Sequence, residues 1–277
     1  MSLPAQANGS SRAVHNPEAS SSLWRRLSEH RAALWRIASI GLFFLIWEIA
    51  GRIPISFAFP TFLETLRAFL VMTFDGSFAA AYAETLQPLV IGIAISAVIG
   101  VGVGIVMGLS RFAEWLVAPV FIVLQAAPMA ALIPLITFVY GIGLLAKTLA
   151  VIMLALPVIA LNGYKAVRNA NPSLVAMCYS FQGTRWQRIA KIIIPDASPV
   201  IFAGLRLGLA AGFIGVILAE LLITPTGIGD LITYHRSVAD YPEMYAAVVS
   251  IILVSTLTLS ALEAFELRVL RPEKRRS

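Results

Sequence analysis

The chain has 277 residues, of which 58% are hydrophobic and 13% charged, with a mean hydropathy of +0.83 and a net charge of +6. Soluble globular chains carry about 25% charged residues, so this chain cannot cover its apolar surface with polar groups and requires a lipid bilayer. Its cations are scattered between apolar runs, which disfavours a nucleic-acid partner and is typical of the cytoplasmic loops of membrane proteins. The single cysteine excludes an internal disulfide, and no Cys/His cluster has the spacing of metal ligands.

Composition divides the chain into four predicted segments. Residues 1–36 form a disordered, basic cytoplasmic N-terminal segment, and 37–83 hold the first transmembrane helix and a periplasmic segment. Residues 84–266 form the membrane core, and 267–277 are a basic cytoplasmic tail. Within the second segment, Pro60-Thr61 is predicted to open a short amphipathic helix.

Six apolar runs are predicted to span the membrane, so the fold class is an all-α membrane protein. Their approximate ranges are 37–53, 85–109, 115–140, 144–162, 200–223 and 245–265. With the N-terminus inside, 16 of the 21 Lys and Arg residues fall on the cytoplasmic side and Arg206 lies near a boundary. Four fall outside, namely Arg52, Arg67, Lys147 and Arg236. This bias predicts that both termini are cytoplasmic.

Two features of the spans are candidates for the translocation path. Pro128 and Pro134 interrupt the third span, and proline kinks a membrane helix where a neighbour or a cavity satisfies the freed carbonyl. A broken helix beside a transport path and simple packing are equally compatible with them. Glu220 lies late in the fifth span, where it either faces the path or makes a structural hydrogen bond. Gly100 and Gly104 are spaced for close helix approach.

The polar stretch 171–195 separates the fourth and fifth spans and is predicted to be a cytoplasmic helix–turn–helix. Asn171-Pro172 is a helix start, and the first helix carries Leu174, Met177, Cys178 and Phe181 on one face. Gly183 is expected to end it in a left-handed conformation. Thr184 and Gln187 form a capping box for a second helix, which Pro195 is expected to end. The apolar face is expected to pack under the spans, and the face with Arg185, Arg188 and Lys191 to meet a soluble partner.

No catalytic or energy-converting site is predicted in this chain. Residues 141–148 approach the phosphate-loop pattern, but Ala146 replaces its second glycine and no strand precedes it. Paired carboxylates, a Ser/His/Asp set and an activated cysteine are lacking, which opposes an intramembrane enzyme. Ion-driven transport would require more polar groups inside the spans, so the energy source is expected to be another polypeptide.

At the stretch 171–195 the sequence resembles the inner-membrane permease subunits of binding-protein-dependent ABC importers. Their signature is Glu-Ala-Ala, three residues, Gly, nine residues, Ile, any residue and Leu-Pro. Ile192, Ile194 and Pro195 fit its end, and the run 184–187 is similar to the sulfonate/taurine/nitrate branch. Further similarity lies in Ala203 to Leu207, Ala219 to Leu222, Pro128 to Leu135 and Tyr140 to Gly143 with Lys147, so that it covers about residues 85–265. Two positions depart from the signature: Ala176-Met177-Cys178 stands for Glu-Ala-Ala, and Gln182 for the glycine.

The resemblance implies an ABC type I importer permease fold with cytoplasmic coupling helices, in the inner membrane. A cytoplasmic ABC ATPase would bind ATP, so no cofactor is expected in this chain, and a periplasmic or lipid-anchored binding protein would deliver the solute. A second permease copy, forming a homodimer, is also implied. The residues expected to couple to the ATPase are Ala176, Met177, Cys178, Gln182, Gly183, Thr184, Arg185, Trp186 and Arg188.

Three alternatives stay open at this point. The solute is expected to be a small anion such as an alkanesulfonate or nitrate, and the same family also imports heterocyclic vitamin precursors. Outside the family, a self-sufficient ion-coupled transporter or channel is the second hypothesis, and an intramembrane enzyme is the third. Transport by this chain alone under an ion gradient would distinguish the second from the importer.

Overall fold

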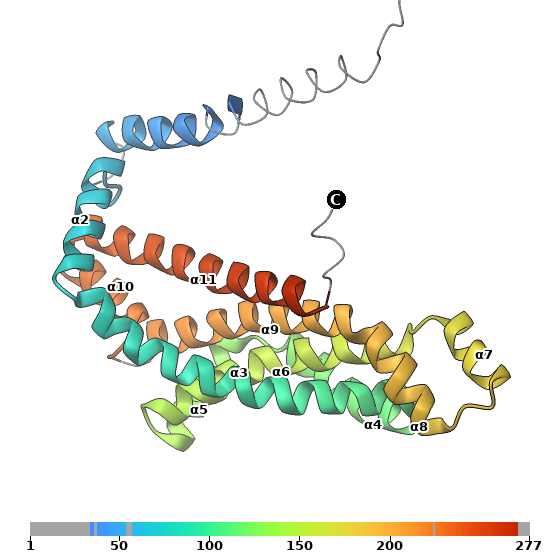
Figure 1. Ribbon diagram of the computed structural model, residues 1–277. Coiled ribbons are helices and arrows are strands. Elements are labelled where there is room, and N and C mark those ends of the chain that lie inside the picture. Colours follow the sequence, from blue (N-terminus) through green and yellow to red (C-terminus); the bar gives the residue numbers. More distant parts are fainter. Residues whose placement is uncertain (1–33, 36–37, 54–56, 224, 271–277) are drawn as a thin grey trace, which may run out of the picture. The chain divides into compact units, whose positions relative to one another are not determined.

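The computed structural model describes residues 34–35, 38–53, 57–223 and 225–270, and it divides into two units, Met1–Ser56 and Phe57–Ser277 (Figure 1). Most of the predicted N-terminal segment 1–36 and the end of the tail 267–277 lie outside the described residues. In the first unit, residues 38–52 are helical, within the first predicted span. The division of the structure falls between Ser56 and Phe57, inside the predicted segment 37–83.

The described residues of the second unit are helices joined by short connections, as predicted for an all-α membrane protein. By length and hydropathy, four of these helices can cross a membrane, or five counting a broken pair as one span. The predicted second to sixth spans each correspond to one of them. The elements are α2 (Phe62–Phe74), α3 (Ser77–Leu109), α4 (Arg111–Ala126), α5 (Met129–Tyr140), α6 (Leu144–Arg168), α7 (Pro172–Ser180), α8 (Arg185–Arg188), η1 (Ile189–Ile193), α9 (Ile194–Leu222), α10 (Ile228–Ser237) and α11 (Tyr241–Leu270).

The short amphipathic helix predicted after Pro60 is α2. Thr61 accepts a hydrogen bond from the Glu64 amide, and Glu64 accepts one from the Thr61 amide, so a capping box fixes the start of the helix. Its buried residues Ala68 and Met72 share an apolar cluster with Ala246 and Ala247 of α11. α2 therefore packs on α11 and belongs to the second unit.

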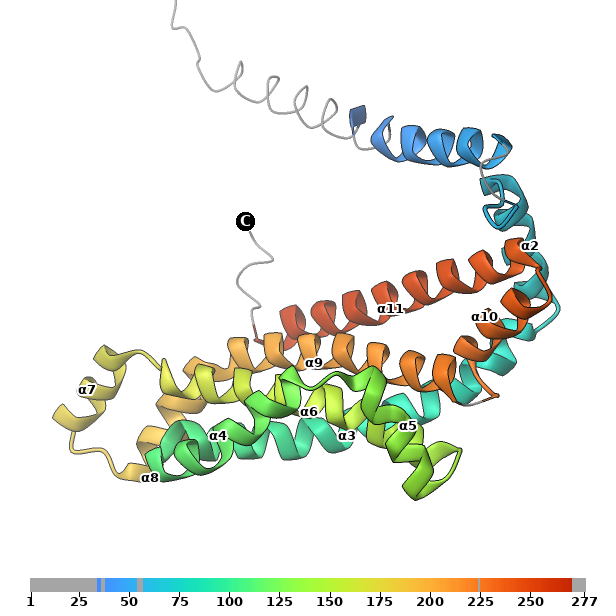
Figure 2. The same ribbon diagram turned by 180° about the vertical axis from the view of Figure 1, so that it is seen from behind.

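The centre of the second unit is α6, which packs along both α3 and α9 (Figures 1 and 2). A Cβ on Gly104 would lie 2.7 Å from the carbonyl oxygen of Ala160 and 3.1 Å from Gly163 Cα. A Cβ on Gly215 of α9 would lie 2.7 Å from the carbonyl oxygen of Ala150. Contacts this short are possible only without side chains, so glycines bring α3 and α9 close to the α6 backbone.

The third predicted span is broken. α4 and α5 are bent by 100° at Ala127 and Pro128, and Pro128 caps α5 while Pro134 lies inside it. Pro128 has no N–H to continue a helix and restricts Ala127 to its observed extended conformation. α5 contacts α6 and α9 (Figure 2). The proline pattern thus predicted a break but not its angle.

One ion-pair network links the last helix of the second unit to α9. Arg206 of α9 contacts two carboxylates, at 3.1 Å for Glu263 and 3.4 Å for Glu266. These two residues lie near the end of α11, so the network ties α11 to α9.

Candidate functional site

Loop 171–195 leaves α6 at Arg168 and enters α9 at Ile194, and its first helix is the one predicted. The Asn171 side chain accepts a hydrogen bond of 2.9 Å from the Ser173 amide, and Pro172 occupies the first turn of α7. The Asn171 amide donates to the Asp196 carboxylate at 2.8 Å. Both ends of the loop are therefore clasped together at its base.

The turn after α7 differs from the prediction in one residue. Gln182, not Gly183, adopts the left-handed conformation, with φ of 54°. Gly183 is required for a different reason: its amide donates to the Cys178 carbonyl at 2.9 Å, and a Cβ there would lie 2.4 Å from Cys178 Sγ. The left-handed position is the one where the importer signature has glycine. The signature glycine therefore fits the left-handed backbone, whereas Gly183 avoids a clash with Cys178.

Replacing Gln182 with glycine is expected to stabilise this turn by about 1 kcal/mol, because a left-handed conformation costs a non-glycine residue roughly that much. Slower proteolysis of the loop in detergent-solubilised Gln182→Gly protein would report the change. Gly183→Ala is the opposite control and should speed cleavage, since the new methyl group meets Cys178. Faster cleavage of Gln182→Gly would contradict this account of the turn.

The second helix begins as predicted but does not end at Pro195. Thr184 and Gln187 form the expected capping box. Helix then continues from Arg185 to Leu222 without a break, through the π-turn η1, in which Ile194 donates to the carbonyl of Ile189. The i−5 register of a π-turn admits a proline that would interrupt an i−4 ladder. Pro195 therefore lies in the first turn of α9 and does not end the helix.

The apolar side chains of the loop pack under the spans only in part: Ile193 is buried in a cluster with residues of α6 and α9, and Val175 and Ile189 pack against that cluster. Phe181 is 80% exposed and Trp186 74%, while Leu174, Met177 and Tyr179 are also exposed and only Cys178 and Ile193 are buried. We call Met177, Tyr179, Phe181, Arg185, Trp186 and Arg188 the loop surface; all of them are exposed except Arg188, which is half-buried. The loop surface contains both apolar and basic side chains, and a partner could contact both kinds.

Arg188 organises the loop surface. Its guanidinium contacts the Tyr179 hydroxyl and lies 4.7 Å from the centre of the Tyr179 ring. A cation over an aromatic face is stabilised by the quadrupole of the ring. This contact joins α7 to α8 across the turn between them, so the two short helices are held together in the loop.

The residues predicted to couple to an ATPase are thus brought together in this loop. Ala176 and Met177 are exposed on α7, whereas Cys178 is buried against Gly183. Gln182 and Thr184 shape the turn. Their role in coupling stays a prediction.

A second site lies at the opposite ends of α6 and α9 and was not predicted. Lys147, expected outside the membrane, and Glu220 are both buried, and Lys147 Nζ lies 2.9 Å from Glu220 Oε1. Lys147 Nζ also donates to the carbonyl and hydroxyl oxygens of Thr226, each at 3.0 Å. Glu220 accepts further bonds from the Thr85 hydroxyl at 2.9 Å and the Gly229 amide at 3.0 Å. We call these five residues the ion-pair cluster.

Of the predicted path residues, Glu220 therefore makes the structural hydrogen bonds that were one of its two expected roles. Pro134 and Pro128 contribute no polar group, but Ile133 shares a small apolar cluster with Ala150 and Ala219, the neighbour of Glu220. A role of these three residues in translocation stays a prediction. Thr85 and the Gly227-Ile228-Gly229 run are the features of the sequence that could have indicated the ion-pair cluster. The sequence alone does not show that they contact Glu220.

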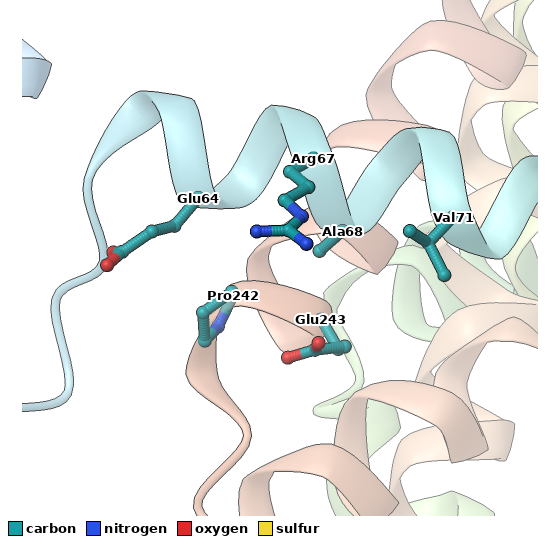
Figure 3. Close-up of a pocket in the computed structure, with 6 residues that line it drawn as sticks. All are labelled: Glu64, Arg67, Ala68, Val71, Pro242 and Glu243. Atoms are coloured by element: carbon teal, nitrogen blue, oxygen red, sulfur yellow. The ribbon is translucent and has the colours of Figure 1, made fainter.

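A cavity of about 350 Å³ lies between α2 and the start of α11, lined by Glu64, Arg67, Ala68, Val71, Pro242 and Glu243 (Figure 3). Arg67 extends from α2 over this cavity, whereas the Glu64 carboxylate turns back to the capping box. Among the described residues, no group of three His, Cys, Asp or Glu side chains could hold a metal ion. Charged and apolar side chains contribute equally to its lining, and it opens to the surface.

Comparison with protein families identifies the chain. The model for the inner membrane component of binding-protein-dependent transport systems matches residues 100–271, which include α6, the loop and α9. The chain belongs to this permease family. It is an inner-membrane, multi-pass transport component, as the resemblance in its loop implied.

Three relatives illustrate the range of the family. The riboflavin transport system permease protein of Chloroflexus aurantiacus is 34% identical over 58% of this chain and 59% of its own length. A putative aliphatic sulfonates transport permease protein of Bacillus subtilis is 25% identical over 82% of this chain and 83% of its own. The taurine transport system permease protein of Escherichia coli is 25% identical over 68% of each chain.

Solved structures confirm the importer permease fold. An inward-facing methionine ABC transporter matches with a TM-score of 0.57 and 19% identity, over 69% of this chain and 94% of that one. An amino acid ABC transporter gives the same score at 20% identity, over 73% of this chain and 98% of that one.

Proposed function

We propose that this permease forms the translocation path of an ATP-driven importer and couples through its loop surface to a separate ATPase. The observation that carries the proposal is the preformed, exposed loop surface at the junction of α6 and α9. Exposed aromatic side chains rimmed by arginines are typical of the centres of protein interfaces. Residues 171–195 contain three cations and no carboxylate, so the complementary groove is apolar and acidic.

The proposal places both termini and the loop in the cytoplasm, on the charge bias described above. A periplasmic or lipid-anchored binding protein would deliver the solute to the opposite end. ATP is bound by the partner, and this chain supplies no cofactor site. A second copy of the chain, which the resemblance implies, would complete the path.

Replacing Arg185 by glutamate tests the coupling role. The substitution inverts a charge facing an acidic groove, so ATPase co-purification is expected to fall about tenfold or more, while membrane insertion is unchanged. Arg236→Glu, on α10 away from the loop, is the matched control. Normal recovery of the ATPase with Arg185→Glu would count against the loop surface as its docking site. Uptake into proteoliposomes by this chain alone under an ion gradient would instead favour a secondary transporter.

For the solute, we propose a small anion of the sulfonate or nitrate kind, which the sulfonate and taurine relatives support. A heterocyclic vitamin precursor is the second candidate, supported by the riboflavin permease and by a formylaminopyrimidine transport permease of Halalkalibacterium halodurans, 26% identical over 81% of this chain. ATP-driven uptake of labelled taurine and of labelled riboflavin, measured side by side, separates them. Riboflavin uptake with no taurine uptake would select the second candidate.

A further inference from the structure

The ion-pair cluster joins four elements through one carboxylate. Thr85 comes from α3, Lys147 from α6 and Glu220 from α9, while Thr226 belongs to the turn after α9 and Gly229 to the first turn of α10. Lys147 makes three contacts, which match the three N–H bonds of an ammonium. Thr85 contacts both Glu220 oxygens and accepts a bond of 3.0 Å from the Ile228 amide. The polar groups of the cluster thus satisfy one another.

The turn is fitted tightly onto the carboxylate. Gly227 has a φ of +100°, and a Cβ on it would lie 2.1 Å from Glu220 Oε1. A Cβ on Gly229 would lie 2.6 Å from Glu220 Cβ. Only glycine permits this approach of the backbone. The turn therefore cannot slide over Glu220 without separating from it.

Separation of these elements would leave a buried charge without its partner. Lys147 and Glu220 side chains are 3% and 0% exposed, so water does not replace the lost contacts. By contrast, α5 meets the same region through the apolar cluster of Ile133, Ala150 and Ala219. Apolar contacts can shift without stranding a charge, and α5 is already set apart from α4 by the 100° bend.

Resting on the proposed function, we propose that the ion-pair cluster keeps α3, α6, α9 and the α9–α10 turn together as one rigid unit throughout the transport cycle. Lys147 and Glu220 are then positioning residues and do not bind the solute. Access to the path at this end opens by movement of α5 and of contacts between copies, outside the unit.

Hydrogen exchange in the complete transporter tests this directly, because the Ile228 and Gly229 amides donate into the cluster. Exchange is measured by mass spectrometry without nucleotide and after trapping with ATP and vanadate. Protection of residues 228–229 is expected to stay within about threefold between the two states, while α5 peptides change. A large loss of protection at 228–229 on trapping would overturn the rigid unit.

Variants separate positioning from solute binding. Lys147→Gln strands the Glu220 charge, so protection at 228–229 should fall roughly 100-fold and uptake with it. Lys147→Gln with Glu220→Gln removes both charges and keeps hydrogen-bonding groups, so protection and uptake should recover together. Lys165→Gln, an exposed lysine at the other end of α6, is the control. Recovered protection without recovered uptake would assign Glu220 to the path and refute the proposal.

The two proposals fail in different ways. If the wild-type complex shows no ATP-driven uptake, the importer function is wrong, and the rigid unit with it. If uptake is intact but the amides at 228–229 lose protection on trapping, only the rigid unit is wrong.

Discussion

Truncating Phe181 and Trp186 to alanine is expected to abolish ATPase association and ATP-driven uptake while leaving the permease folded in the membrane. Both side chains are largely exposed, so their removal costs the isolated permease little packing. In an interface, buried aromatic side chains carry about 2 kcal/mol or more each, which is roughly a thirtyfold loss of affinity per residue.

Co-purification of the ATPase and uptake in proteoliposomes measure this effect, with each single variant examined before the pair because such contributions are not additive. Phe74→Ala is the matched control, since Phe74 is 86% exposed but ends α2, far along the chain from the loop. Its ATPase recovery should equal that of the wild type. Normal recovery with the double variant would remove the loop surface from the interface.

Gly104→Leu is expected to disrupt the second unit. The contact of Gly104 is with the backbone of α6 at Ala160, Gly163 and Tyr164, which cannot move aside as a flexible side chain would. Overpacking a core costs typically 1–3 kcal/mol, and a backbone contact places the change at the upper end. The variant should aggregate on extraction or lose at least about 10 °C of thermal stability in detergent.

Gly102→Leu is the internal control for that result. Gly102 lies two residues away on α3, and a Cβ there meets nothing within 4 Å. It should retain thermal stability close to the wild type in a fluorescence-based unfolding assay. Equal stability of the two variants would contradict the close approach of α3 to α6.

Local signals in the sequence predicted much of the fold. The caps at Asn171 and at Thr184 with Gln187 are governed by neighbouring residues, and the spans by their length and hydropathy. The helix α10 lies between the fifth and sixth predicted spans, and no helix is predicted there because its apolar positions are few; it packs on α11.

The parts that sequence missed depend on residues far apart in the chain. Lys147 and Glu220 are separated by 73 positions in the sequence. The count of Lys and Arg on each side of the membrane assigns Lys147 to the outside, because such a count does not show which carboxylate a lysine pairs with. The sequence predicts the left-handed conformation at Gly183, one residue too late, because glycine is the residue that usually adopts it. In the structure Gln182 adopts it, and Gly183 is needed for its close contact with Cys178. The exposure of the loop surface also depends on tertiary packing, which cannot be predicted from the spacing of apolar residues in the sequence.

The unbroken helix from Arg185 to Leu222 has a mechanical consequence. At 1.5 Å per residue, the helical path from Trp186 to Glu220 is about 50 Å long, and it bends between α8 and α9 (Figure 1). A tilt of about 5° about one end would carry the other by about 4 Å. A small rotation of this continuous helix about its loop end would therefore appear at its other end, beside the ion-pair cluster, as a displacement of several ångströms.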